Sequence, residues 1–218
     1  MLELLDSVRG RPLNLLCLGA HCDDIEIGCG AAVRKILGSG RDVRVSWHVL
    51  SSNDARRPEA ERGAGIFAAD AQECEVRIQD FRNGYFPYVA AELKDYFETL
   101  KNGFDPDIVL THYEGDRHQD HRTVSQLTWN TFRNHWILEY EIPKYDGDLG
   151  SPNFFIPISG EEARFKADKI VGCFETQQSK RWFEQSTFLS LMRLRGIECN
   201  AESGYAEAFY VRNSVFAS

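Results

Sequence analysis

Short apolar runs alternate along much of the chain with segments whose apolar residues recur at helical spacing. The run Leu13–Leu18 is almost entirely hydrophobic and ends at Gly19, which is typical of a strand buried on both faces. Leu93, Phe97 and Leu100 fall on one stripe, as in an amphipathic helix. This pattern predicts strands at 13–18, 43–50, 73–79 and 107–111, and helices at 31–37, 58–71, 89–101 and 121–134.

The regular alternation of strands and helices predicts the fold class. Strands separated by helices favour an α/β, Rossmann-like, doubly wound and mostly parallel sheet flanked by helices. Further strands are expected at 137–141, 154–156 and 209–211, and further helices at 161–174 and 179–194. We therefore expect a single domain over residues 1–218 with a C-terminal strand and helix elaboration, and a long surface loop at 143–152.

Charge and hydropathy exclude several classes of protein. The formal net charge of −8 argues against nucleic acid as a partner, because binding to a phosphate backbone depends on Lys and Arg. No apolar run reaches membrane-spanning length, and the mixed-charge segment 1–11 is not a secretory signal. Six scattered cysteines without a C-x-x-C pair indicate core residues in a reducing compartment rather than a disulfide framework. We therefore expect a cytoplasmic protein.

Two polar clusters follow the first and fourth predicted strands. The first contains His21, Asp23 and Asp24, and the second contains His118, Asp120 and His121. In a doubly wound sheet these strands are neighbours, and ligands collect at the carboxyl ends of strands where their order reverses. Residues nearly a hundred positions apart are therefore expected to meet at one site.

The residue types of the clusters suit a catalytic metal. Neutral histidine and carboxylate oxygen bind zinc, and a catalytic zinc keeps three protein ligands and a water. His21 and Asp24 can face one point, while Asp23 between them suits a general base. One of His118 and His121 can bind metal while the other faces substrate.

Simpler interpretations of these residues remain open. Asp23 and Asp24 could cap a helix N-terminus, and residues 118–121 could be a solvated helix start. Asp120 could fix the tautomer of an imidazole. His112 could support a ligand or simply end its strand, whereas His48 and His135 are expected to bind no metal.

A dinucleotide-binding function is not supported by the glycine pattern. The G-x-G-x-x-G sequence after the first strand is missing, because Val33 takes the place of the third glycine after Gly28 and Gly30. The small residues more simply allow a helix to pack closely on the sheet.

At these residues the chain resembles a known family. Its A-H-P-D-D sequence is matched by residues 20–24, and its H-x-D-H sequence by residues 118–121. Weaker likenesses are Arg56 with Glu59, the turn 81–84 and the segment 205–209. The chain thus resembles the LmbE/PIG-L-like family of zinc-dependent N-acetylglucosamine deacetylases, which implies zinc as cofactor.

The resemblance assigns roles residue by residue. The implied zinc ligands are His21, Asp24 and His121. Asp23 is implied to be the general base, His118 the group that stabilises the oxyanion and protonates the leaving amine, and Asp120 the partner that orients His118. Arg56 and Asn83 fall where members of the family contact the sugar.

The chain departs from the family pattern at two of these positions. Cys22 replaces the usual proline, and Asn83 replaces the usual aspartate.

The expected function is a metal-dependent hydrolase that removes the N-acetyl group from an N-acetylglucosamine-type sugar or its conjugate. The alternatives are a zinc-dependent amidase for a larger acyl group and a non-catalytic sugar- or nucleotide-binding module. Iron, cobalt or manganese could replace zinc at such donors. A homo-oligomer is possible through the aromatics near Trp129, Phe132 and Trp136, which could equally be core.

Overall fold

The computed structural model describes residues 11–213, so the prediction for the N-terminal segment lies almost wholly outside the described residues. The strands are β1 (Leu13–Gly19), β2 (Val43–Val49), β3 (Glu73–Ile78), β4 (Ile108–His112), β5 (Trp136–Tyr140), β6 (Phe154–Ile158) and β7 (Tyr205–Tyr210). The helices are α1 (Asp24–Leu37), α2 (Arg57–Phe67), η2 (Phe86–Tyr88), α3 (Ala90–Gly103), α4 (Gln119–Thr131), α5 (Gly160–Cys173), η3 (Glu175–Gln177) and α6 (Gln185–Glu198).

The strands form one sheet of order β3-β2-β1-β4-β5-β7-β6. Strands β1 to β5 are parallel, and β7 lies antiparallel between β5 and β6. The predicted doubly wound, mostly parallel sheet is therefore confirmed, with β1 directly beside β4. The carboxyl ends of these two strands mark the point where the strand order reverses.

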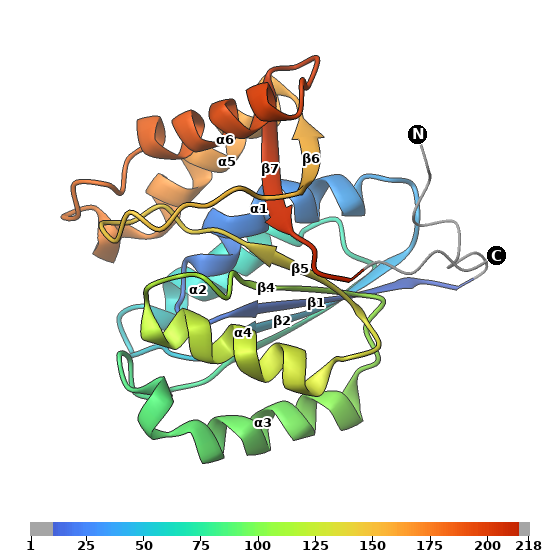
Figure 1. The fold of residues 1–218 in the computed structure, drawn as a ribbon, viewed down its shortest axis with the longest axis vertical. Helices are drawn as coiled ribbons and strands as arrows, with labels where there is room; N and C mark the ends of the chain where they lie inside the picture. The colour runs from blue at the N-terminus through green and yellow to red at the C-terminus, as the bar shows by residue number, and fades with distance from the viewer. Residues whose placement is uncertain (1–10, 214–218) are drawn as a thin grey trace.

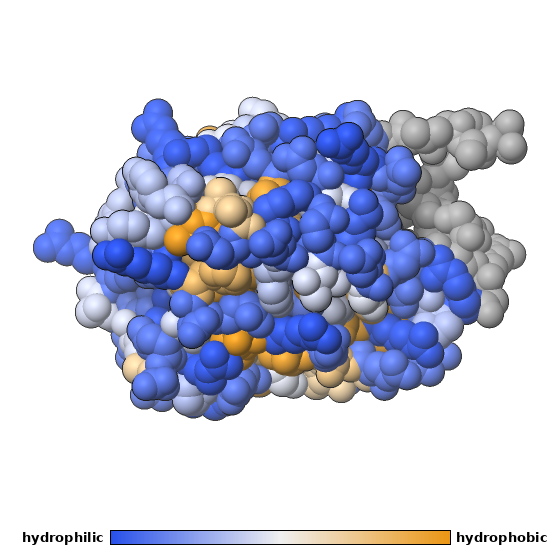
Figure 2. Space-filling view, turned by 90° about the horizontal axis from the view of Figure 1, so that it is seen from below, coloured by the Kyte–Doolittle hydropathy of each residue, from blue (hydrophilic) through white to orange (hydrophobic). Residues whose placement is uncertain are grey.

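Helices cover both faces of the sheet, with α1, α2, α5 and α6 on one face and α3 and α4 on the other (Figure 1). Strand β1 supplies both cores, because side chains alternate along a strand: Leu15 and Cys17 pack on one face, and Leu16 and Leu18 on the other. The face seen from below, where α3 and α4 lie, is mainly hydrophilic with small apolar areas between polar side chains (Figure 2).

Helix α1 begins at Asp24 rather than at residue 31, because its glycines do not interrupt it. A Cβ on Gly28 would lie 2.0 Å from the Tyr140 ring, and one on Gly30 would lie 2.8 Å from the Phe67 ring. Gly28 therefore allows α1 to pack closely on Tyr140 of the sheet, as predicted, whereas Gly30 allows close packing on Phe67 of α2. As a result, α1 starts at the polar cluster after β1.

Two predicted helix starts differ from the structure near the site. Helix α4 begins at Gln119 instead of residue 121, which places Asp120 in its first turn. Helix α6 begins at Gln185 instead of residue 179. The residues before α6 leave the helical path because Phe183 is buried and Trp182 packs against Phe188.

A buried ion pair joins the C-terminal part of the fold to α1. The Glu207 carboxylate of β7 accepts the backbone N–H groups of Ala31 and Ala32 at 3.0 and 2.6 Å. Lys166 of α5 pairs with Glu207 and donates to the carbonyl of Ile27 at 2.6 Å. Side chains from α5 and β7 thus satisfy backbone groups in the middle of the helix that begins at the site.

Of the aromatic residues considered for an interface, Phe132 lies in the core, whereas Trp129 and Trp136 are partly buried against it. Phe132 is fully buried, Trp129 donates its indole N–H to Glu139, and Trp136 packs edge-on against Phe154. All six cysteines are free, and four of them are buried. Within residues 11–213, none of the helices is both long and apolar enough to cross a bilayer.

Candidate functional site

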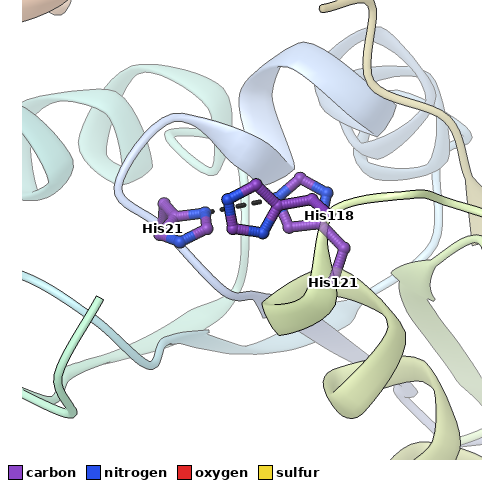
Figure 3. A group of neighbouring side chains, drawn as sticks. All are labelled: His21, His118 and His121. Carbon is purple, nitrogen blue, oxygen red and sulfur yellow. Dashed lines mark hydrogen bonds between the residues drawn. The ribbon is translucent and has the colours of Figure 1, made fainter. Parts of the chain in front are cut away.

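The two polar clusters meet at the carboxyl ends of β1 and β4. His21 lies in the turn after β1, and His121 lies in the first turn of α4 after β4. His21 Nδ1 and His121 Nε2 are 3.2 Å apart, and His118 lies beside them (Figure 3). The predicted convergence of the two segments is therefore present.

Three donor atoms are spaced as a metal would require. Asp24 Oδ2 lies 3.2 Å from His21 Nδ1 and 3.5 Å from His121 Nε2. Ligand distances of about 2.0–2.1 Å imply separations of about 3.3 Å between donors in a tetrahedral zinc site. The backbone N–H of His21 also donates to Asp24 Oδ2 at 2.7 Å, which fixes the carboxylate. These residues fit a bound divalent metal.

The full cluster contains more donors than one ion needs. Two groups of three side chains could each hold a metal, and they share His121. They are His21, His118 and His121, and Asp24, His112 and His121.

His112 lies behind the cluster. It is fully buried, its ring stacks on that of His121 with 3.9 Å between centroids, and its Nε2 accepts the backbone N–H of Ala20 at 2.9 Å. It does not line the pocket that reaches the other donors. His112 therefore packs behind His121 and holds the turn after β1 in place from within the protein.

Asp23 is separate from the donor cluster. It occupies the N-cap position of α1, but its side chain makes no capping hydrogen bond. Instead Asp23 Oδ1 accepts Arg56 Nη2 at 2.7 Å, and the residue is only 5% exposed. Burial raises the pKa of Asp23, and the nearby Arg56 charge opposes this shift. A buried carboxylate beside the donors, free of a capping role, suits proton transfer.

Asp120 contacts a different histidine from the one that the resemblance implied. Its Oδ2 lies 3.3 Å from His21 Nε2 and accepts the N–H of Gly84 at 2.6 Å. His118 is linked to Asp120 only through the backbone, because the Asp120 N–H donates to His118 Nδ1 at 3.3 Å. Thus the Asp120 carboxylate orients His21, and His118 caps α4 while its ring faces the pocket.

Asp116 orients His121 and was missed by the sequence analysis. Its Oδ2 lies 2.8 Å from His121 Nδ1 and 2.8 Å from Lys144 Nζ, while its Oδ1 accepts the N–H of His118 at 2.7 Å. Burial alone would raise the pKa of Asp116, but the bond from His121 and the Lys144 charge lower it overall. The only sequence signal for this role of Asp116 was its position two residues before His118.

The pKa shifts differ among the histidines of the cluster, and burial lowers the pKa of His121 to about 3. Burial alone would lower the pKa of His21, but the carboxylates of Asp24 and Asp120 raise it to about 9. Burial would raise the pKa of Asp24, yet the surrounding histidines lower it well below its usual range. Carboxylates that stay ionised among imidazoles provide a site for a cation.

A pocket of about 220 Å³ opens onto the cluster. Arg56 and Asn83 both line it, and Arg56 Nε is a buried donor without a partner among the described residues. The other lining residues are His21, Asp23, Asp24, His118, His121, Ile142, Lys144, Tyr145, Asp146, Lys180 and Trp182. Lys144, Tyr145 and Asp146 belong to the predicted loop 143–152, whereas Ile142, Lys180 and Trp182 were not expected at the site.

Two relatives of the chain are described as deacetylases. It is 30% identical over 155 residues to the uncharacterized deacetylase YaiS of Escherichia coli strain K12, covering 64% of this chain and 79% of that protein. It is 29% identical over 151 residues to the diacetylchitobiose deacetylase of Thermococcus kodakarensis, covering 58% of this chain and 53% of that protein.

Fold similarity extends beyond deacetylases. The 4-carboxy-2-hydroxymuconate hydratase GalB of Pseudomonas putida KT2440 superposes with a TM-score of 0.72 at 16% identity, over 94% of this chain and 98% of that one. This likeness shows the fold alone.

The family assignment rests on the segment that carries both polar clusters. The family described as PIG-L, GlcNAc-PI de-N-acetylase, matches residues 16–132, which is more than half of the chain and includes every expected ligand. The chain therefore belongs to the PIG-L family of de-N-acetylases.

Proposed function

We propose that this protein is a zinc-dependent hydrolase that removes the N-acetyl group from an N-acetylglucosamine-type sugar or its conjugate. The observation that carries the proposal is the convergence of His21 Nδ1, Asp24 Oδ2 and His121 Nε2 within 3.5 Å of one another beside the pocket. These three residues would hold the metal. The same donors accept other divalent transition metals, so zinc is the proposed ion by donor type.

Each neighbouring side chain has a proposed task. A bound zinc would supply a Lewis acid and lower the pKa of a water toward about 7. Asp23 accepts the proton of the attacking water, and Arg56 holds its carboxylate in place. His118 stabilises the developing oxyanion and delivers a proton to the leaving amine. Asp116 and Asp120 hold the imidazoles of His121 and His21.

The sugar would occupy the pocket beside these groups. Arg56 Nε is a buried donor that a sugar hydroxyl can satisfy, and Asn83 offers both a donor and an acceptor at the edge. GlcNAc-PI and diacetylchitobiose, the substrates that the family and relative names give, both contain N-acetylated glucosamine. The substrate class is therefore proposed as N-acetylglucosamine linked to a second group.

The test is acetate release by zinc-loaded protein from diacetylchitobiose, N-acetylglucosamine 1-phosphate and simple N-acetylglucosaminides. Asp23→Asn should keep the metal and reduce kcat by about 10²–10⁴-fold, because a positioned general base contributes that much. Near-normal turnover of this variant with stoichiometric zinc would refute the assigned base. Faster release of a longer acyl group would instead support the amidase alternative, and no acyl release at all would refute the hydrolase.

A further inference from the structure

Four side chains at the mouth of the catalytic pocket have no task in the proposed chemistry. Tyr145 and Asp146 belong to the loop after β5, and Lys180 and Trp182 precede α6. All four line the pocket, and we call them the outer wall. The two segments that carry them lie side by side, and the backbone N–H of Arg181 donates to the Tyr145 hydroxyl at 3.1 Å (Figure 1).

The outer wall is held in place from both segments. Near the end of the loop, the carbonyl of Gly150 accepts Arg195 Nη2 at 3.0 Å, and the Gly150 N–H donates to the Tyr210 hydroxyl at 3.0 Å. On the other side, the Trp182 ring packs edge-on against the buried ring of Phe183. A wall that is already ordered can bind a ligand with little further loss of conformational entropy.

Tyr145 and the half-buried Trp182 give the outer wall two aromatic surfaces. Tyr145 is 70% exposed, and its ring belongs to neither of the two hydrophobic cores. The C–H groups on one face of a pyranose ring form a flat apolar surface, and aromatic rings at binding sites supply contact area of this kind. The outer wall is therefore suited to the face of a sugar.

Lys180 and Asp146 offer a hydrogen-bond donor and an acceptor beside the two rings. Both are exposed, and within residues 11–213 neither side chain has an ion-pair partner, whereas the other pocket cations, Arg56 and Lys144, are both paired with carboxylates. Sugar hydroxyls both donate and accept, so an ammonium and a carboxylate can bind them together. An anionic group would instead be attracted by Lys180 and repelled by Asp146.

We propose that the outer wall is a subsite for a second sugar residue, so that the substrate is N-acetylglucosamine in glycosidic linkage to another sugar. Pockets that enclose drug-sized ligands have volumes of about 300–1,000 Å³. The catalytic pocket, at about 220 Å³, therefore holds one sugar residue and leaves the next at its mouth. This inference rests on the proposed function, because it takes the N-acetylated residue to be the one beside the metal ligands.

Ligand binding tests the subsite separately from the chemistry. Zinc-loaded Asp23→Asn protein, which should not turn over, is titrated by calorimetry with diacetylchitobiose and with methyl N-acetylglucosaminide of the same anomer. The disaccharide should bind more tightly. Adding Tyr145→Ala should raise the Kd of the disaccharide about 2- to 10-fold, because one aromatic contact is lost, and should leave the Kd of the methyl glycoside unchanged.

Two control variants isolate the aromatic contact. Tyr145→Phe keeps the ring and should retain most of the disaccharide affinity. Tyr88→Ala is the matched control, because Tyr88 is 75% exposed but does not line the pocket, and it should change neither Kd. An unchanged disaccharide Kd in Tyr145→Ala, or an equal rise in Tyr88→Ala, would overturn the proposal.

A charge variant distinguishes a sugar from an anion at the outer wall. Lys180→Gln keeps a donor and loses the charge, so it should leave disaccharide binding nearly unchanged. N-acetylglucosamine 1-phosphate should bind less tightly than the disaccharide. If the phosphate binds more tightly and loses this advantage in Lys180→Gln, the outer wall recognises an anion and the proposal is wrong.

The subsite and the proposed hydrolase can fail separately. Disaccharide binding that depends on Tyr145, without acetate release by the wild-type protein, would support the subsite and refute the hydrolase. Acetate release from the disaccharide and the methyl glycoside with equal kcat/KM would support the hydrolase and refute the subsite.

Discussion

Replacing Asp116 by asparagine should weaken metal binding without changing a metal ligand. The carboxylate accepts hydrogen bonds at both oxygens: His118 N–H donates to one, and His121 Nδ1 and Lys144 donate to the other. An amide has only one acceptor oxygen, so in either orientation its NH₂ group faces a donor. The His121 ring would lose the fixed acceptor that holds its Nε2 toward the other proposed ligands.

The expected size follows from the type of contact. Removing a carboxylate that holds a metal-binding imidazole typically costs about 10–100-fold in metal affinity. This corresponds to about 1.4–2.8 kcal/mol of binding free energy. We expect the upper part of this range, because the Asp116 side chain is only 3% exposed and water cannot easily replace it.

Competition with a chromophoric chelator, starting from metal-free protein, measures the affinity for Zn²⁺. Asp148→Asn is the matched control, because Asp148 also bonds Lys144 but has no bond to His121. Both Asp148 bonds reach the same oxygen, from Lys144 and from the Arg117 N–H, so an amide can keep them. Wild-type zinc affinity in Asp116→Asn, or an equal loss in Asp148→Asn, would refute this role of Asp116.

Four further substitutions test packing and burial. Burial lowers the pKa of His48 to about 4 from its usual 6.5, so the folded state resists a proton that the unfolded state accepts. His48 alone should therefore lower the free energy of unfolding by about 3 kcal/mol between pH 6.5 and pH 4, and His48→Gln should reduce the total loss in urea titrations at each pH. Gly28→Ala should lower the free energy of unfolding by about 1–3 kcal/mol, because the new Cβ would clash with Tyr140. Gly65→Ala, where a Cβ meets nothing within 4 Å, should raise it by up to about 1 kcal/mol. Equal effects in thermal unfolding would contradict the packing argument. Glu26→Gln should raise the free energy of unfolding at pH 8 by about 1–3 kcal/mol, because burial without hydrogen-bond partners within the described residues raises the pKa of Glu26, whereas the unfolded carboxyl is ionised at this pH. A decrease would show that the charge is needed.

The position of the site could be predicted because it depends on local pattern and one rule of topology. The run that ends at Gly19 identified β1, and the polar residues on either side of the sheet's switch point then had to approach one another. This reasoning brought His21 and His121 together correctly.

The partners of the histidines could not be predicted, because they depend on loop geometry. Asp116 and Asp120 both lie close to His118 and His121 in sequence. The hydrogen bonds of Asp120 to Gly84 and Phe86 turn its carboxylate toward His21, and only Asp116 remains for His121. Sequence spacing alone does not show which backbone groups compete for a carboxylate.

The order of β5, β6 and β7 in the sheet could not be predicted from the sequence either. Strand β7 lies between β5 and β6, pairing Tyr140 with Phe209 and Phe154 with Phe209. Such pairing is set by long-range packing, and residues 205–210 carry no local signal for a central antiparallel strand. The start of α6 was missed because Phe183 enters the core before the helix begins.

The buried contact between Glu207 and the middle of α1 has a consequence for biosynthesis. Residues 31 and 32 leave the ribosome long before residue 207. The backbone N–H groups of Ala31 and Ala32 therefore lack the Glu207 carboxylate as an acceptor until β7 has been synthesised. Ribosome-bound chains stopped before residue 205 should therefore expose α1 amides to solvent exchange, and they should become protected once Glu207 has emerged.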